Sequence, residues 1–225
     1  MARFKKIHTL SKMESIGLIP VFYHADAAIA KQVAGACHAG GALVMEFTNR
    51  GDFAWEVFSA LEKYVRTELP DMILGVGSIV DPYTASLYIA NGANFVVGPV
   101  LNAEVAKLCN RHGVPYMPGC GSATEVQQAQ ELGSDIVKVF PGDSVGGPDF
   151  VKSVKGPMPW TSIMPTGGVS PTYDSLSAWL KAGVTCMGVG SNLITKEILA
   201  KGDYKKLADD VKTALSIIAE IRSKK

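Results

Sequence analysis

The sequence predicts an α/β fold, a TIM (β/α)8 barrel with an extra N-terminal helix, built as one domain over residues 1–225. Short apolar segments rich in β-forming residues alternate with longer segments of helical period, and this alternation counts as eight units. Strands that are apolar throughout are buried on both faces, which indicates a parallel sheet covered by helices. Eight such units fit a closed barrel better than an open sheet.

The elements follow one another regularly. A helical segment at residues 5–15 precedes the first strand. The predicted strands lie at residues 18–23, 42–48, 72–78, 94–99, 115–119, 135–142, 161–168 and 185–191. The helical segments that follow them lie at residues 27–41, 52–69, 81–92, 102–113, 122–133, 149–155 and 172–183, and the longest part of the closing segment is 204–222. Several of these segments end in glycine, the usual residue at a helix C-terminus.

A doubly wound open sheet is the alternative architecture. That fold places a GxGxxG turn after its first strand and an acidic residue after its second. The first unit of this chain has no such turn, and its second strand does not end in that manner. The barrel is therefore the preferred prediction.

The composition of the chain limits which binding partners and which cellular compartment we expect. Hydrophobic residues make up 47% of the chain, and 22 Lys and Arg residues face 21 Asp and Glu residues, so no net field attracts nucleic acid. No apolar run approaches the roughly 18 residues that a membrane span needs. The four cysteines are widely separated in apolar segments, which predicts buried, reduced thiols and a cytoplasmic protein. They are Cys37, Cys109, Cys120 and Cys186.

A lysine interrupts the apolar segment DIVKVFPG, residues 135–142. Active sites of barrels lie at the C-terminal ends of the strands. By strand alternation Lys138 shares a face with Ile136, and Glu46 in MEFTNR shares a face with Thr48, so both charged groups are expected to point inward near the mouth. A purely structural interpretation stays open, in which Lys138 reaches solvent or forms only an ion pair with Glu46.

The chemistry that these residue types favour is cleavage through an imine. A lysine among apolar groups has a lowered pKa, and its free amine attacks carbonyl groups. The iminium formed from a 2-oxo acid accepts electrons when the C3–C4 bond breaks, and a carboxylate such as Glu46 can take the proton of the C4 hydroxyl. The planar guanidinium of Arg50 suits the carboxylate of the substrate.

Two glycine-rich strand ends predict an anion site. Thr166, Gly167 and Gly168 follow the seventh strand, and the GVGS segment after the eighth ends at Ser191. Barrels often bind phosphate at these positions through backbone N–H groups. No cationic residue occurs in these two loops, so the sequence predicts that dipoles alone hold the phosphate.

These motifs, taken in order, resemble the class I aldolases for 2-keto-3-deoxy-6-phosphogluconate and 4-hydroxy-2-oxoglutarate, the KDPG/KHG aldolases. The resemblance runs from about Ile19 to Ser191 and rests on EFTNR, GVGS, ANGANFVVGP, the PG at 118–119, KVFP, PTGG and the final GVGS. It implies a lyase, a homotrimer, a small 2-oxo acid substrate and no metal or other cofactor.

The resemblance also implies roles for individual residues. Lys138 would form the Schiff base, Glu46 would be the general acid and base, and Arg50 would bind the substrate carboxylate. The other implied substrate-binding residues are Thr166 near the pyruvyl part, Gly167, Gly168 and Ser191 at the phosphate, and Ser78, Pro99 and Phe140 in the pocket wall. Three positions depart from the family pattern. Ser78 replaces Thr, Val139 replaces Phe, and Tyr23 replaces an Arg that a subset of members carries.

Several functional interpretations remain open at this stage. The preferred substrate is 2-keto-3-deoxy-6-phosphogluconate, cleaved to pyruvate and glyceraldehyde 3-phosphate. The alternatives are 4-hydroxy-2-oxoglutarate, which gives pyruvate and glyoxylate, and the galactonate-derived C4 epimer. More remote alternatives are a phosphosugar isomerase or epimerase, in which Lys138 acts only by its charge, and a non-catalytic phosphosugar-binding barrel.

The remaining chemistry-bearing residues are expected to have structural roles. The four histidines show no metal-ligand spacing, and they are His8, His24, His38 and His112. Trp55, Trp160 and Trp179 lie in or beside outer helices, which predicts that all three pack against the barrel wall.

Overall fold

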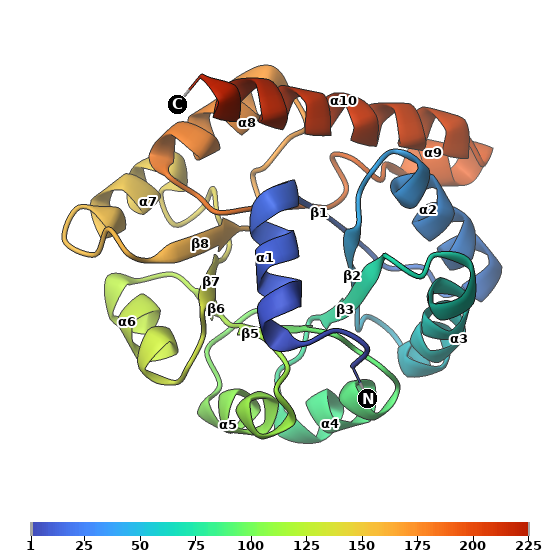
Figure 1. Ribbon diagram of the computed structural model, residues 1–225, viewed down its shortest axis with the longest axis horizontal. Coiled ribbons are helices and arrows are strands. Elements are labelled where there is room, and N and C mark those ends of the chain that lie inside the picture. The colour runs from blue at the N-terminus through green and yellow to red at the C-terminus, as the bar shows by residue number, and fades with distance from the viewer. Residues whose placement is uncertain (1, 225) are drawn as a thin grey trace.

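The computed structural model describes residues 2–224, which contain nine strands and ten helices (Figure 1). The strands are β1 (Leu18–Phe22), β2 (Val44–Thr48), β3 (Ile73–Gly77), β4 (Val96–Val97), β5 (Tyr116–Met117), β6 (Gly119–Cys120), β7 (Ile136–Val139), β8 (Ser162–Pro165) and β9 (Met187–Val189). The helices are α1 (Lys6–Ile16), α2 (Ala27–Ala39), α3 (Ala54–Glu68), α4 (Pro82–Ala90), α5 (Ala103–His112), α6 (Ala123–Glu131), α7 (Gly147–Lys155), α8 (Tyr173–Ala182), α9 (Lys196–Lys201) and α10 (Tyr204–Ser223).

The strands form a closed, all-parallel barrel. One sheet has the order β5-β4-β3-β2-β1-β9 and the other has the order β6-β7-β8. β5 and β6 flank Pro118, which has no N–H to donate, and its carbonyl accepts the backbone N–H of Lys138 at 3.1 Å. A parallel bridge between Thr166 and Gly188 joins β8 to β9 on the other side. With β5 and β6 counted as one interrupted strand, the eight-stranded barrel predicted from the sequence is confirmed.

Six of the ten helices begin at a residue whose side chain caps the first turn, namely α2, α4, α5, α6, α9 and α10. The side chain of Asp81 accepts the backbone N–H of Thr84 at 2.8 Å, and Pro82 occupies the first turn of α4. Asn102 and Ser122 cap α5 and α6 in the same way. Within residues 2–224, no helix combines the length and the apolar character needed to cross a membrane.

The barrel interior changes from apolar to charged along the strands. Ile136 of β7 and Val44 of β2 belong to the inner apolar cluster, and the next inward positions along these strands are Lys138 and Glu46. The outward positions of β7, Val137 and Val139, belong instead to the larger core between the strands and the surrounding helices. The charged pair therefore lies above an apolar floor, toward the C-terminal ends of the strands.

Helix α1 closes the other end of the barrel and appears in the centre of the view in Figure 1. Met13 of α1 is fully buried in the inner cluster, and Leu10 and Ile16 pack against it. Gly17 ends the helix in the left-handed conformation with a φ of 74°, and its N–H donates to the carbonyl of Met13. The extra N-terminal helix predicted from the sequence thus seals the floor of the site.

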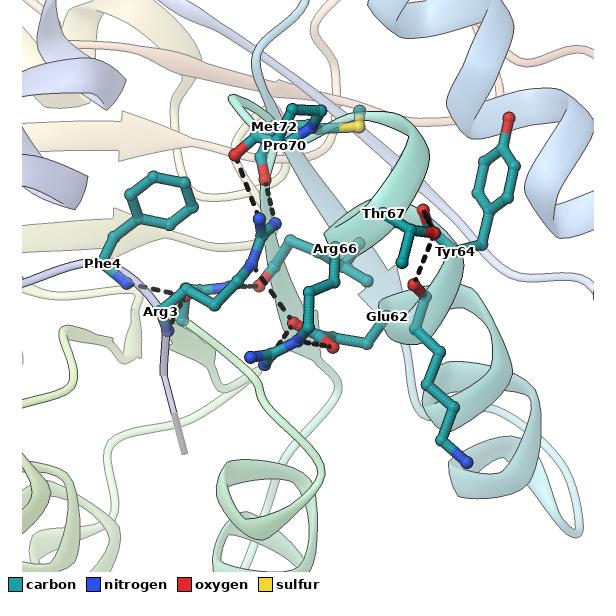
Figure 2. A network of polar contacts seen from close by, with 11 residues as sticks. Arg3, Phe4, Glu62, Tyr64, Arg66, Thr67, Pro70 and Met72 are labelled. Carbon is teal, nitrogen blue, oxygen red and sulfur yellow. Dashed lines mark hydrogen bonds and ion pairs between the residues drawn. The ribbon is translucent and has the colours of Figure 1, made fainter.

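The segment before α1 is fastened to the same end by the polar network in Figure 2. The guanidinium of Arg3 donates to the carbonyl oxygens of Pro70 at 3.0 Å and Met72 at 2.8 Å, and it lies 3.5 Å from the buried carboxylate of Glu62. Arg66 donates two further hydrogen bonds to Glu62, each 3.0 Å long. These contacts tie the N-terminal segment to α3 and to the start of β3.

The prediction for the tryptophans is correct for only one of the three. Trp179 is buried with 2% exposure, whereas Trp160 is 70% exposed and Trp55 is 40% exposed. Trp160 lies in the turn between α7 and β8, outside the helical pattern that would direct it inward, and Trp55 lies in the first turn of α3. All four cysteines are free and buried, as predicted.

Candidate active site

Two charged side chains are buried together near the mouth of the barrel. Lys138 is 5% exposed and Glu46 is 1% exposed, and both point into the interior as the strand alternation predicts. Burial lowers the pKa of Lys138 more than the nearby Glu46 carboxylate raises it, and the charge of Arg50 lowers it further. Burial likewise raises the pKa of Glu46, against the opposing effects of Lys138 and Arg50. Lys138 is therefore disposed to present a free amine.

The environment of the Lys138 amine is apolar on one side. Nζ lies 4.7 Å from the centroid of the Phe140 ring, a distance at which an aromatic face attracts a cation. Phe140, predicted to line the pocket, is thus directly beside the lysine.

Two buried polar atoms of the site have no hydrogen-bond partner among residues 2–224. They are Oε2 of Glu46 and Oγ1 of Thr166. An unpaired buried polar group costs about 1–3 kcal/mol, so a partner that binds there, such as a substrate or a water molecule, lowers this cost. A substrate that presents a hydroxyl to Glu46 and a polar atom to Thr166 would satisfy both.

A cavity of about 430 Å³ opens at the same end of the barrel. It brings together six residues predicted from the sequence to bind substrate, namely Arg50, Phe140, Thr166, Gly167, Gly168 and Ser191. Lys138 and Glu46 do not line it themselves. Two residues that line the cavity lie near this buried pair. The ring of Phe140 lies beside the Lys138 amine, and the charge of Arg50 affects the pKa values of both Lys138 and Glu46. Larger hollows, such as the 660 Å³ groove beside Trp55 and Lys63, lie on the outside of the helices.

Two predicted pocket residues lie elsewhere at the mouth. Ser78 directly follows β3 and adopts the left-handed conformation with a φ of 62°, which is uncommon for a residue other than glycine. Pro99 follows β4, and its carbonyl lies against the backbone of Gly119. Neither residue is among those described as lining the cavity, so their contact with a substrate stays a prediction.

The two glycine-rich strand ends meet at the cavity wall. Gly167 and Gly168 have φ values of 90° and 71°, a backbone conformation that favours glycine. The side chain of Asn192 donates to the carbonyl of Val169 and to the hydroxyl of Ser170, both at 3.0 Å. These bonds fix the loop after β9 against the loop after β8.

Sequence reasoning missed a cation in this wall. Lys196, the first residue of α9, lines the cavity together with Ser191, so a charged group is present where only dipoles were expected. Its position five residues beyond Ser191 placed it outside the loop that the sequence motif covers. The sequence does contain one signal for a helix that begins at Lys196, the capping residue Thr195. Its side-chain oxygen accepts the N–H of Ile198 in the first turn of α9.

The neighbouring end of β1 contributes an aromatic residue. Tyr23 lines the cavity, and its ring lies 5.6 Å from that of Phe47. His24 accepts the backbone N–H of Asp26 through Nδ1 at 3.0 Å and is not among the described lining residues. The site thus contains a buried amine, a buried carboxylate and a cavity with cationic and glycine-rich walls.

Comparison with known proteins agrees with this arrangement. The family model for KDPG and KHG aldolase matches residues 9–209. The chain is 32% identical over 206 residues to the 2-dehydro-3-deoxy-phosphogluconate aldolase of Treponema pallidum, an alignment that covers 92% of this chain and 95% of that protein. It is 30% identical over 190 residues to the KHG/KDPG aldolase of Escherichia coli strain K12, covering 84% and 86% of the two chains.

Solved structures of this family have the same barrel. The KDPG aldolase of Legionella pneumophila, with pyruvate captured as a covalent carbinolamine intermediate, superposes with a TM-score of 0.83 at 25% identity over 92% of this chain and 97% of that one. The 2-keto-3-deoxy-6-phosphogluconate aldolase of Zymomonas mobilis gives a TM-score of 0.81 at 29% identity, over 92% and 96%. The match of family model, relatives and barrel shows that the chain is an aldolase, and hence a lyase, and that it belongs to the KDPG and KHG aldolase family.

Proposed function

We propose that the protein cleaves 2-keto-3-deoxy-6-phosphogluconate to pyruvate and glyceraldehyde 3-phosphate through a Schiff base on Lys138. One observation carries this proposal above the others. The Lys138 amine is buried with its pKa lowered, beside a buried Glu46 carboxylate that has an unpaired oxygen among the described residues. A nucleophile and a base so placed are what imine-mediated cleavage requires.

The proposed reaction begins with the free amine. Lys138 Nζ attacks the C2 carbonyl of the substrate, and loss of water from the carbinolamine gives an iminium ion. Arg50 binds the adjacent carboxylate through its planar guanidinium. Thr166, whose Oγ1 has no partner among residues 2–224, hydrogen-bonds to the same pyruvyl part.

Cleavage follows from the position of the base. Glu46 removes the proton of the C4 hydroxyl, the C3–C4 bond breaks, and its electron pair moves to C3 as the iminium becomes an enamine. The C4 oxygen is then part of the aldehyde that leaves. Protonation at C3 restores the iminium, and water releases pyruvate and the Lys138 amine.

The phosphorylated substrate is favoured by the far part of the cavity. Backbone groups of Gly167 and Gly168 and the hydroxyl of Ser191 line it together, and such groups suit the oxygens of a phosphate. The relatives include proteins named for 2-dehydro-3-deoxy-phosphogluconate and one named KHG/KDPG aldolase. That second name favours 4-hydroxy-2-oxoglutarate as the next candidate substrate. We also expect Ser78, Pro99 and Phe140 to contribute to the pocket wall.

Trapping with borohydride tests the proposed chemistry. Incubation with pyruvate and borohydride is expected to add the mass of a reduced pyruvyl group to the peptide that contains Lys138. Lys138→Arg, which keeps a cation but has no primary amine, should lose both the adduct and cleavage. If Lys138→Arg kept more than about a hundredth of the activity, a loss of only about 2.7 kcal/mol, covalent catalysis by this residue would be wrong.

For assembly, we propose a homotrimer that forms in the cytoplasm. Supporting the trimer, exposed apolar side chains gather on the loops after β2, β3 and β4 and on α4, which are adjacent around the barrel. They are Phe53, Val80, Tyr83, Leu87 and Val100. Tyr83→Glu is expected to give monomers by light scattering, whereas Ile7→Glu at the other end of the barrel should leave the mass unchanged. Equal masses for both variants would argue against this interface.

A further inference from the structure

We infer that Lys196 binds the distal anionic group of the substrate and thereby determines which 2-oxo acid the aldolase prefers. The inference rests on the proposed function and extends it, because it assigns a specificity role to a side chain beyond the glycine-rich loops. Lys196 begins the short helix α9 and lines the same cavity as Ser191 and Gly168.

The charge of Lys196 is available to a ligand. Among residues 2–224 Lys196 forms no ion pair, and its side chain is exposed at the cavity wall. The adjacent Glu197 is already engaged by Lys201, with Oε1 and Nζ 2.7 Å apart. The described residues that line the cavity include no aspartate or glutamate. An anion that enters the cavity therefore meets an uncompensated ammonium group.

The cavity holds two cations that come from different parts of the chain. Arg50 follows β2 and lies close enough to the buried pair to act electrostatically on both Lys138 and Glu46. Lys196 comes instead from the segment after β9, which lines the cavity with Ser191, Asn192 and Ile194. Arg50 is therefore the cation near the reacting carbons, and Lys196 is the cation of the remote part of the cavity.

This separation matches a substrate with two anionic ends. The carboxylate of a 2-oxo acid is attached directly to C2, the atom that Lys138 attacks, so it lies beside Arg50. Carbon C6, which carries the phosphate, lies four bonds along the carbon chain from C2, so the phosphate is remote from Arg50 and can pair with a second cation. Pyruvate has only the first anionic group and does not extend to Lys196.

The loop that precedes Lys196 is held in place. Asn192 hydrogen-bonds to Val169 and Ser170 in the loop after β8, and Thr195 caps α9 through the N–H of Ile198 at 3.2 Å. The start of α9 is thus fixed relative to Gly167 and Gly168. The backbone at Lys196 is therefore held beside the cavity, and its exposed side chain extends from that point.

The test compares Lys196→Met with the matched variant Lys181→Met. Lys181 is exposed in the last turn of α8, lies outside the described cavity lining and carries the same charge. In Lys196→Met we expect kcat/KM for 2-keto-3-deoxy-6-phosphogluconate to fall about tenfold, the effect of losing one charge-assisted hydrogen bond at an exposed site. Competitive inhibition by inorganic phosphate should weaken in parallel, and Lys196→Arg should retain both.

Pyruvate trapping on Lys138 distinguishes a failure of the proposed Schiff-base function from a failure of the inference about Lys196. Lys196→Met is expected to trap pyruvate as the wild type does, since pyruvate has no distal anion. Wild-type protein that fails to trap pyruvate would overturn the proposed function. Normal trapping together with equal kcat/KM values and equal phosphate inhibition in Lys196→Met and Lys181→Met would overturn the inference about Lys196 alone.

Discussion

The carboxylate of Glu46 fills the space beside Gly77 that a side chain at position 77 would need. A Cβ built on Gly77 would overlap Oε1 of Glu46, and β2 and β3 are adjacent strands in register. The second glycine of the GVGS segment, Gly77, is the last residue of β3 and therefore makes room for the proposed base. It acts by leaving space, not by contacting the substrate.

Gly77→Ala is expected to displace the Glu46 carboxylate and to lower kcat by about 10²-fold, the usual effect of a 1 Å misplacement of a reacting group. Pyruvate trapping on Lys138 should persist, because the amine is unchanged. Gly35→Ala is the matched control, since its Cβ would meet only the Tyr64 hydroxyl at 3.4 Å on the outside of the barrel. Unchanged kcat in Gly77→Ala would show that the position of Glu46 does not depend on this space.

The opposing charges around Lys138 predict shifts in its titration. Glu46 raises the pKa of Lys138 and Arg50 lowers it. Glu46→Gln removes the first effect, so the pKa falls and the amine becomes reactive at lower pH. Arg50→Gln removes the second effect, so the pKa rises and reactivity moves to higher pH.

These shifts are measured by reductive methylation of Lys138 with formaldehyde across a pH series, read by mass spectrometry. Formaldehyde has no carboxylate, so loss of substrate binding by Arg50 does not affect the result. The midpoints are expected in the order Glu46→Gln, wild type, Arg50→Gln. The reverse order would contradict the electrostatic assignment. In a separate cleavage assay, Glu46→Gln should also lower kcat by roughly 10²- to 10⁴-fold, the range for loss of a general base.

The sequence predicted best the positions of those site residues that lie on strands or at strand ends. Side chains alternate strictly along a strand, so Lys138 and Glu46 could be assigned to the interior from Ile136 and Thr48 alone. Parallel strands place their C-terminal ends together, which brought Thr166 and Ser191 to one cavity. Both predictions use only the local geometry of strands, so they do not depend on the course of the loops.

The parts that the sequence did not predict depend on how the chain continues after a strand. Lys196 reaches the cavity because the loop after β9 turns back and starts α9, a path set by bonds from Asn192 to another loop. Trp160 is exposed because it lies in a turn, where no period directs a side chain inward. The apolar pattern predicts one continuous strand over residues 115–119, whereas Pro118 separates β5 from β6. Proline has no backbone N–H, and a pattern of apolar residues does not reveal this missing donor.

The N-terminal network of Figure 2 is expected to stabilise the fold without affecting catalysis. Arg3→Met removes the hydrogen bonds to Pro70 and Met72 and one ion pair of the buried Glu62, a loss of about 1–3 kcal/mol. For a chain of this size the melting temperature should fall by roughly 2–4 °C per kcal/mol.

Lys152→Met is the matched control for Arg3→Met. Its side chain is 58% exposed and pairs with Asp149, which is 87% exposed, so this ion pair is screened by solvent and is worth about 0–1 kcal/mol. Calorimetry of both variants should show the larger loss in Arg3→Met, with kcat/KM unchanged in each. A lower kcat/KM in Arg3→Met would connect the floor of the barrel to the active site.

The last prediction separates a phosphosugar aldolase from one for unphosphorylated acids. Ser191→Asp introduces a carboxylate at the cavity wall and removes the hydroxyl donor. Like charges placed side by side cost several kcal/mol, so kcat/KM for 2-keto-3-deoxy-6-phosphogluconate should fall by about 10²-fold or more. The remote binding energy also orients the reacting centre, so kcat should fall along with affinity.

The loss for 4-hydroxy-2-oxoglutarate is expected to be much smaller, because its second carboxylate is C5 itself, bonded to C4, and carries a single charge closer to the reacting carbons. Ser191→Ala removes only the hydroxyl and should cost about tenfold with the phosphorylated substrate, which separates lost donation from repulsion. Steady-state kinetics with both substrates decides the question. Equal losses on the two substrates in Ser191→Asp would mean that no phosphate binds at Ser191, and 4-hydroxy-2-oxoglutarate would then become the better assignment.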